Sequence, residues 1–115
     1  MLRVAIPIFR LRVSPILDSC TRIILIDIEH NQEIERSEIH LNGLSLIERV
    51  SVLEKASVKT IICGAISDMF QNMLQNVKIY MITGIAGEVE QVVGAYLSES
   101  LNDPQFYMPG LKANH

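Results

Sequence analysis

The chain has 115 residues, 49% of them hydrophobic and 20% charged, and ten Lys and Arg against thirteen Asp and Glu give a formal net charge of −3. This length and composition predict one globular domain with a sizeable core and exclude disorder for most of the chain. The acidic balance disfavours a dedicated nucleic-acid-binding protein, and two cysteines, Cys20 and Cys63, are too few for a disulfide scaffold.

The first half of the chain predicts three strands. Arg3–Ile8 is a nearly continuous apolar run, which is typical of a strand covered on both faces. After a loop over Phe9–Cys20, Thr21–Glu29 is rich in β-branched residues. Glu33–Ile39 then returns as a polar strand, and its charges suit an exposed sheet edge. The last two strands form a predicted hairpin.

The second half alternates helices with short strands. Ser45-Leu46-Ile47-Glu48 has the capping-box pattern and begins a helix that ends near Ser57. Buried strands are predicted at Val58–Cys63 and Lys78–Ile82, separated by a helix that Ser67 or Asp68 caps. Apolar residues at helical spacing predict the last helix: Val89, Val92, Val93, Tyr96 and Leu97.

The element order predicts an α/β fold with one mixed five-stranded sheet and three helices. Right-handed crossovers place the first strand centrally, in the order 3-2-1-4-5, which is the order of the ribonuclease H-like fold. We expect a single domain over residues 1–101 and a C-terminal tail over residues 102–115. The tail is expected to be mobile or to dock on another subunit through its apolar residues: Phe106, Tyr107 and Met108.

The apolar runs in the sequence are short. Ile23–Ile26 and Ile61–Ile66 fall well below the roughly 20 residues that span a bilayer. The run from Val4 to Phe9 is too short for a signal-peptide core. We therefore expect no membrane association and a cytoplasmic protein with reduced thiols.

The predicted topology brings chemically useful residues to one edge of the sheet. Cys20 lies at the start of the second strand, His40 at the end of the third and Cys63 at the end of the fourth. Gly64 and Gly84 follow the fourth and fifth strands. Chain direction switches sides at this edge, and ligands of open α/β sheets commonly bind at such a switch point.

These residue types point to iron chemistry. Thiolates and imidazole are ligands of iron and of iron–sulfur clusters, so Cys20, His40 and Cys63 form a candidate ligand set. The second and fourth strands lie roughly 9–10 Å apart, too far for a disulfide without loop movement. The alternative is that Cys63 is a packed core thiol, that Cys20 has no role in a site and that His40 faces solvent. Gly84 belongs either to an anion-binding nest or to a turn that needs a flexible backbone.

Signatures of common enzymes are missing from the sequence. It contains no Walker loop and no GxSxG, HExxH or CxxC motif. Nucleases with the ribonuclease H-like fold bind two metals through carboxylates that begin on the first strand, and Arg3–Ile8 contains no acidic residue. We therefore expect a protein without catalytic activity.

Three segments resemble the dinitrogenase iron–molybdenum cofactor biosynthesis family in order and spacing: Val4-Ala5-Ile6-Pro7, Arg12-Val13-Ser14-Pro15 and Ile61-Ile62-Cys63-Gly64. The strand, glycine turn and final helix over Lys78–Leu97 are also similar to those of the family. The resemblance runs from about Arg3 to Leu101. It implies the ribonuclease H-like fold and a protein that binds or carries an iron–sulfur cofactor precursor during nitrogenase cofactor assembly, or a relative with another role.

The chain departs from the family pattern at three places. Ile16-Leu17-Asp18 stands where family members commonly have His-Phe-Gly, so a ligand histidine is missing. His40-Leu41-Asn42-Gly43 is shorter than the usual Gly-rich, His-containing loop. Cys63-Gly64-Ala65-Ile66-Ser67 adds side chains to a Cys-Gly-Gly-Ile-Gly turn. The fold rests on buried residues and tolerates these changes, but cluster binding does not follow from the fold.

Two functions are open. The first is a non-enzymatic binding or carrier protein for an iron–sulfur or iron–molybdenum-type cluster, acting with metallocofactor-assembly proteins in a process related to nitrogen fixation. The second is an interaction or regulatory module that keeps the fold and has lost the cluster. Cys20, His40 and Cys63 are the candidate cluster ligands. The complete candidate binding site comprises Arg12, Ser14, Cys20, His40, Cys63, Gly64 and Gly84.

Overall fold

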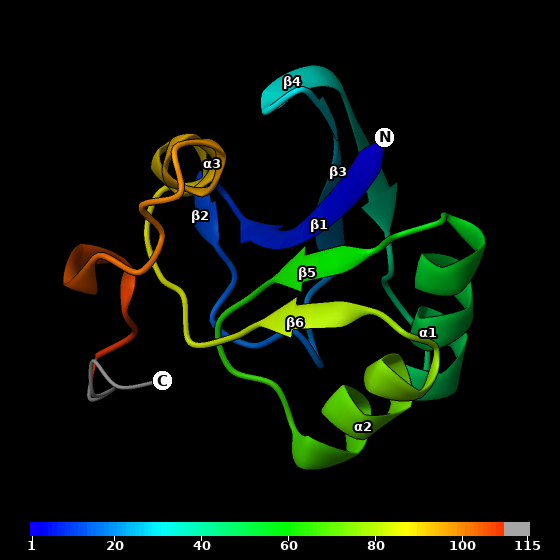
Figure 1. Cartoon of the computed structure of the whole chain (residues 1–115). Helices are drawn as coiled ribbons and strands as arrows, with labels where there is room; N and C mark the ends of the chain where they lie inside the picture. The colour runs from blue at the N-terminus through cyan, green and yellow to red at the C-terminus, as the bar shows by residue number, and fades with distance from the viewer. Residues whose placement is uncertain (110–115) are drawn as a thin grey trace.

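A mixed β-sheet forms the middle layer of the computed structural model, which describes residues 1–109 (Figure 1). Five of its strands run in the order β4-β3-β1-β5-β6, and β1 is antiparallel to β3 and parallel to β5. This arrangement confirms the α/β class and the order 3-2-1-4-5. The six strands within the described residues are β1 (Leu2–Phe9), β2 (Arg12–Val13), β3 (Arg22–Glu29), β4 (Gln32–His40), β5 (Thr60–Ile62) and β6 (Tyr80–Ile82).

The sixth strand, β2, lies inside Phe9–Cys20, which the sequence pattern presents as a loop. It pairs antiparallel with β1 through Ile8 with Val13 and Phe9 with Arg12. The chain reverses within two residues because Arg10 adopts a positive φ of 58°, and tight hairpin turns use such backbone angles. A strand of two residues is too short to leave a periodic pattern in the sequence.

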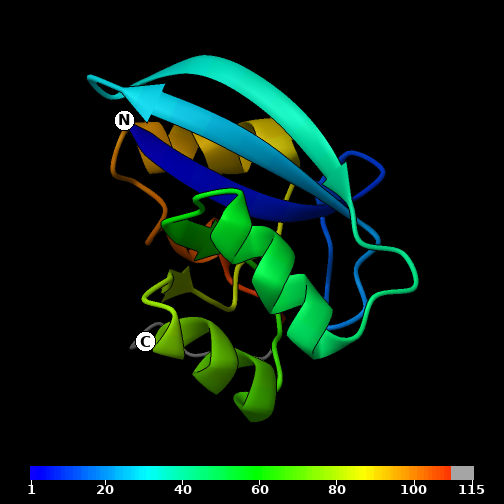
Figure 2. The ribbon, with the colours of Figure 1, turned by 90° about the vertical axis from the view of Figure 1, so that its right-hand side faces the viewer.

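Helices cover both faces of the sheet. α3 lies on one face, and α1 and α2 lie on the other (Figures 1 and 2). The predicted capping box is present, because Ser45 Oγ accepts a hydrogen bond from the Glu48 N–H and the Glu48 carboxylate accepts one from the Ser45 N–H. None of the helices within residues 1–109 is long and apolar enough to cross a membrane. Their bounds are α1 (Leu46–Lys55), α2 (Asp68–Asn76) and α3 (Val89–Leu97).

The central strands contribute to two hydrophobic cores. Val4, Ile6 and Ile8 of β1 pack in the core under α3, whereas Ala5 packs in the core under α1 and α2. β3 alternates in the same way, with Leu25 on the α1 and α2 side. This alternation explains the continuous apolar run of each strand, because both faces are buried.

Charged pairs connect the strands to one another and to the helices. Arg3 on β1 lies opposite Asp27 on β3 and donates to its two carboxylate oxygens at 2.7 and 3.0 Å. Arg3 also donates to the Ala56 carbonyl oxygen at 2.8 Å, which joins the sheet to the end of α1. On the exposed strand β4, Arg36 reaches Glu90 of α3 at 2.6 Å. This contact joins the edge of the sheet to the helix above it.

The chain after α3 packs back onto the same domain. A short 3₁₀ helix, η1 (Pro104–Phe106), buries Phe106 in the core under α3. The Phe106 carbonyl accepts from the Ala86 N–H at 2.7 Å, and the Met108 N–H donates to the Gly84 carbonyl at 2.9 Å. Phe106 thus docks on its own chain and not on another subunit. Residues 110–115 lie outside the described part, and the division into a domain over 1–101 and a tail over 102–115 stays a prediction.

Candidate functional site

The switch-point edge of the sheet, called the rim below, is formed by the segments that follow β1, β5 and β6. After β2 the chain crosses this edge, and the Ser14 N–H donates to the Pro7 carbonyl at 2.8 Å. The Ala65 N–H donates to the Pro15 carbonyl at 2.8 Å, and the Leu17 N–H donates to the Ala65 carbonyl at 2.9 Å. The segment after β2 therefore pairs with the turn after β5 and fills part of the switch-point crevice.

Gly64 is required by this packing. A Cβ atom on Gly64 would lie 2.6 Å from the carbonyl oxygen of Pro15, closer than carbon and oxygen atoms pack in protein interiors. The approach that needs a glycine is thus made by the protein's own loop. The glycine of the family-like Cys63-Gly64 pair is explained by this local packing.

The two cysteines lie in the same core, under α1 and α2. Cys63 is fully buried and Cys20 is 4% exposed. Burial raises the pKa of the Cys20 thiol to about 11 and that of Cys63 to about 12, and a Cys20 thiolate would raise the pKa of Cys63 further. Both groups are therefore protonated thiols at neutral pH, whereas the thiolate is the form that binds metals.

A buried arginine contacts Cys20. The Arg49 guanidinium donates through Nε to the Leu44 carbonyl at 3.0 Å and through Nη1 to the Cys20 carbonyl, with Cys20 Sγ 3.9 Å away. Its charge lowers the pKa of the Cys20 thiol, but the effect of burial is larger. Arg49 is missing from the sequence-based site. The signal was present, because positions 46, 49, 50 and 53 share one face of a helix and Val50 and Leu53 are buried there.

His40 lies apart from the thiols. It is the last residue of β4, its side chain is 70% exposed, and its Nε2 lies 3.3 Å from the Glu38 carboxylate. Within residues 1–109 no group of three or more His, Cys, Asp and Glu is arranged to hold a metal ion. The structure thus brings Cys20 and Cys63 into one core and leaves His40 on the solvent side of the sheet edge.

The remaining predicted site residues use their backbone groups within the fold. Arg12 is exposed and forms an isolated bridge with Glu88. Ser14 is 8% exposed, and as part of the crossing segment it donates its N–H to the Pro7 carbonyl. Gly84 has a positive φ of 76°, donates to the Gly64 carbonyl at 2.9 Å and accepts from Met108. The positive φ supports the interpretation of a turn that needs glycine.

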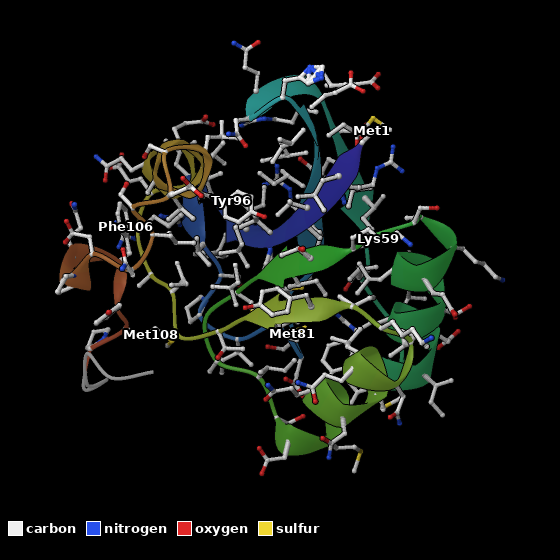
Figure 3. The ribbon with its side chains drawn as sticks, in the orientation of Figure 1. Met1, Lys59, Met81, Tyr96, Phe106 and Met108 are labelled. Atoms are coloured by element: carbon white, nitrogen blue, oxygen red, sulfur yellow. The ribbon has the colours of Figure 1, made fainter. Side chains whose placement is uncertain are left out.

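A hollow of about 360 Å³ remains open at the rim, where the turns after β5 and β6 meet. Backbone atoms and apolar side chains form most of its wall, and Figure 3 shows Met108 near the end of β6. Neither Cys20 nor Cys63 is among the residues that line the hollow. The lining residues are Gly64, Ala65, Ile66, Gln71, Thr83, Gly84, Met108 and Pro109.

The chain was compared with known protein families and solved structures. The family model described as dinitrogenase iron–molybdenum cofactor matches residues 1–99. The chain belongs to this family. The match covers every strand and all three helices of the structure, and it ends before η1. A search of curated proteins found no match to the sequence.

Solved structures share the fold of this family member. PH0822 is 18% identical with a TM-score of 0.80, over 85% of this chain and 90% of that chain. MJ0327 of Methanocaldococcus jannaschii is 18% identical with a TM-score of 0.73, over 86% and 90%. The apo form of the orange protein of Desulfovibrio gigas is 19% identical with a TM-score of 0.71, over 87% and 90%. At these identities the similarity establishes the fold.

Proposed function

We propose that this member of the dinitrogenase iron–molybdenum cofactor family is a non-catalytic accessory protein that binds or carries an iron–sulfur or iron–molybdenum-type cluster. The observation that carries the proposal is the family match over residues 1–99, which includes the turns at Gly64 and Gly84 but not Met108 and Pro109 of the hollow. The cluster is cargo in this proposal, and the proteins that make or receive it are the partners. Reduced thiols and a cytoplasmic location belong to the same proposal.

The three predicted ligands do not fit direct cluster ligation in the described conformation. Cys20 and Cys63 are buried and protonated, and His40 is exposed beside Glu38. The rim hollow is open to solvent and lined by the turns at Gly64 and Gly84, and Met108 supplies a thioether, a soft ligand, to its lining. We therefore assign the cargo to this hollow, contacted there by side chains such as Met108 and Gln71.

Anaerobic reconstitution with iron and sulfide, with and without molybdate, tests this proposal. We expect the wild type to retain iron after desalting and to show a visible charge-transfer absorption band. Because the cargo is assigned to the hollow, the Cys20→Ser, Cys63→Ser double variant should retain most of the bound iron. Loss of iron from that variant, with its fold intact by circular dichroism, would instead identify the thiols as ligands.

A matched histidine pair sharpens the experiment. His40 lies at the end of β4 that meets the rim, and His30 lies in the β3–β4 turn at the opposite end of the strands. His40→Ala and His30→Ala should retain iron equally, since neither residue lines the hollow. Loss of bound iron in His40→Ala but not in His30→Ala would identify His40 as a cluster ligand.

A second function is favoured by the burial of both thiols. A family member that keeps the fold but holds its only two cysteines in the core is suited to act as an interaction or regulatory module without a cluster. Wild-type protein that retains no iron under any of the reconstitution conditions would support this module and refute the carrier.

A further inference from the structure

The β6 edge of the sheet is open. β6 ends the strand order, and no strand within residues 1–109 pairs with its outer side. The Tyr80 N–H donates to the Lys59 carbonyl, and the Ile82 carbonyl accepts from the Cys63 N–H, so these residues bond to β5. Alternate residues of a strand direct their backbone groups to opposite sides, so Met81 presents its N–H and C=O outward. Such an edge is a template for another strand.

The opposite edge is protected and β6 is not. β4 has a register irregularity against β3 between Asp27 and Ile28. Its exposed surface carries charged side chains, which oppose edge-to-edge pairing: Glu33, Glu35, Arg36 and Glu38. β6 consists of Tyr80, Met81 and Ile82, without a charge. The sheet therefore has one edge that repels a further strand and one that accepts it.

A groove of about 530 Å³ runs beside this open edge, on the face that α3 covers only in part. Tyr80 and Ile82 contribute to it from β6, and Tyr96 contributes from α3, as Figure 3 shows for Tyr96 above the sheet. Tyr80 is 67% exposed, a large aromatic surface without cover. Tyr107 and Leu101 form the wall near the end of the chain.

We propose that β6 pairs antiparallel with β6 of a second copy of this chain, about a two-fold axis at Met81. The two Met81 residues then exchange N–H and C=O, and each Thr83 N–H meets the Ile79 carbonyl of the second copy. In this register Tyr80 lies opposite Ile82 of the second copy on the same face of the joined sheet. Each exposed Tyr80 thus enters the groove of the other copy, which is the self-complementarity that a two-fold interface requires.

Charge complementarity identifies the second copy as the occupant. The two-fold axis brings the amino end of one β6 beside the carboxyl end of the other. Exposed Lys78 precedes β6. At the other end, Thr83 and Asn102 line the groove together, and exposed Asp103, whose Oδ1 also accepts from the Gln105 N–H, follows Asn102. Lys78 of each copy therefore approaches Asp103 of the other, and such pairs set the register of an interface.

Sedimentation velocity of the full chain, from micromolar to sub-millimolar concentration, tests the proposal. We expect the wild type to dimerise as concentration rises, and Lys78→Glu and Asp103→Lys each to weaken dimerisation about tenfold. The charge-swapped double variant should recover most of the wild-type dimer. Lys55→Glu makes the same charge change at an exposed position of α1 and should leave dimerisation unchanged.

Met81→Pro provides an independent variant. It removes an outward N–H that pairs with no strand within residues 1–109, and edge strands tolerate proline at such positions. We expect a monomer with the wild-type circular dichroism spectrum. A wild type that stays monomeric throughout overturns the proposal, as does a dimer that persists in both Met81→Pro and Lys78→Glu. Wild-type monomer that captures a strand of another protein at β6 would also refute the second copy.

Discussion

Cys20 and Cys63 differ from reactive cysteines in two properties that control thiol chemistry, solvent exposure and pKa. They lie in the core under α1 and α2, and burial raises the pKa of each thiol to about 11 or 12. Arg49 offsets only part of this effect at Cys20. Either thiol becomes a ligand only after the core that buries it opens.

We predict slow thiol labelling in the native state. With both thiols buried and protonated at pH 7, a disulfide reagent such as dithionitrobenzoate should react at least about a hundredfold more slowly with folded protein than with protein in urea. The measurement is the absorbance of released thiol anion, and the urea sample provides the control. Prompt release of stoichiometric thiol from folded protein would contradict the burial of both cysteines.

Asp27 provides a pH-dependent contribution to stability. The Arg3 guanidinium, hydrogen-bonded to the Asp27 carboxylate, holds the pKa of that carboxyl below its usual value. Because the pKa is lower in the folded state, the ionised carboxylate stabilises the fold at pH values above the unfolded pKa of about 4. This stabilisation is lost as pH falls through the folded-state pKa. We expect Asp27→Asn to lower the free energy of unfolding by about 1–3 kcal/mol at neutral pH.

The urea-unfolding difference between wild type and Asp27→Asn should shrink below pH 4, because the wild-type carboxyl then also becomes neutral. Glu29→Gln, on the exposed end of β3, is the matched control and should change stability by less than about 0.5 kcal/mol. A difference that is constant from pH 7 to pH 3 would assign the effect to packing and not to charge.

At the scale of elements, the rim depends on the contact between the segment after β2 and the turn after β5. Ile16 bridges Ala65 in parallel, and the Pro15 carbonyl lies over Gly64. Leu17 of the same segment donates to the Ala65 carbonyl and packs in the core that holds both thiols. The element pair therefore links the stability of the rim to the accessibility of Cys63.

Gly64→Ala tests this contact. The added Cβ would meet the Pro15 carbonyl at 2.6 Å, and we expect a loss of about 1–3 kcal/mol in the free energy of unfolding from overpacking. Thiol labelling should accelerate in the same variant. Gly94→Ala, on the exposed side of α3 with nothing within 4 Å of the new Cβ, should instead stabilise by about 0.5–1 kcal/mol. Unchanged stability of Gly64→Ala would show that the segment moves aside without cost.

At the scale of the whole molecule, the fold was predictable and the site only partly so. The strand order follows from apolar runs such as Arg3–Ile8 and from right-handed crossovers, which act on many residues at once. Cys63 follows a buried run, so its core position was one of the two readings of the sequence. Arg49 was missed because a charged residue on a helix is commonly exposed.

The loop contacts could not be predicted from the sequence, because single residues determine them. β2 depends on the positive φ of Arg10, and the docking of Phe106 depends on hydrogen bonds between separate segments. Neither leaves a periodic pattern. Gly64 resembled a ligand-contacting glycine, but the atom that approaches it belongs to Pro15. Identifying such a partner requires three-dimensional coordinates.

The central claim, that the rim hollow receives a cluster, is tested most directly by amide spectra of isotope-labelled protein before and after anaerobic reconstitution. A paramagnetic cluster in the hollow should broaden the amide signals of Gly64, Ala65, Ile66 and Gly84, which line it. The β3–β4 turn at residues 29–32 lies at the end of the strands away from the rim, and its amide signals should stay sharp. Protein that holds iron while its rim amides stay unchanged would contradict the claim.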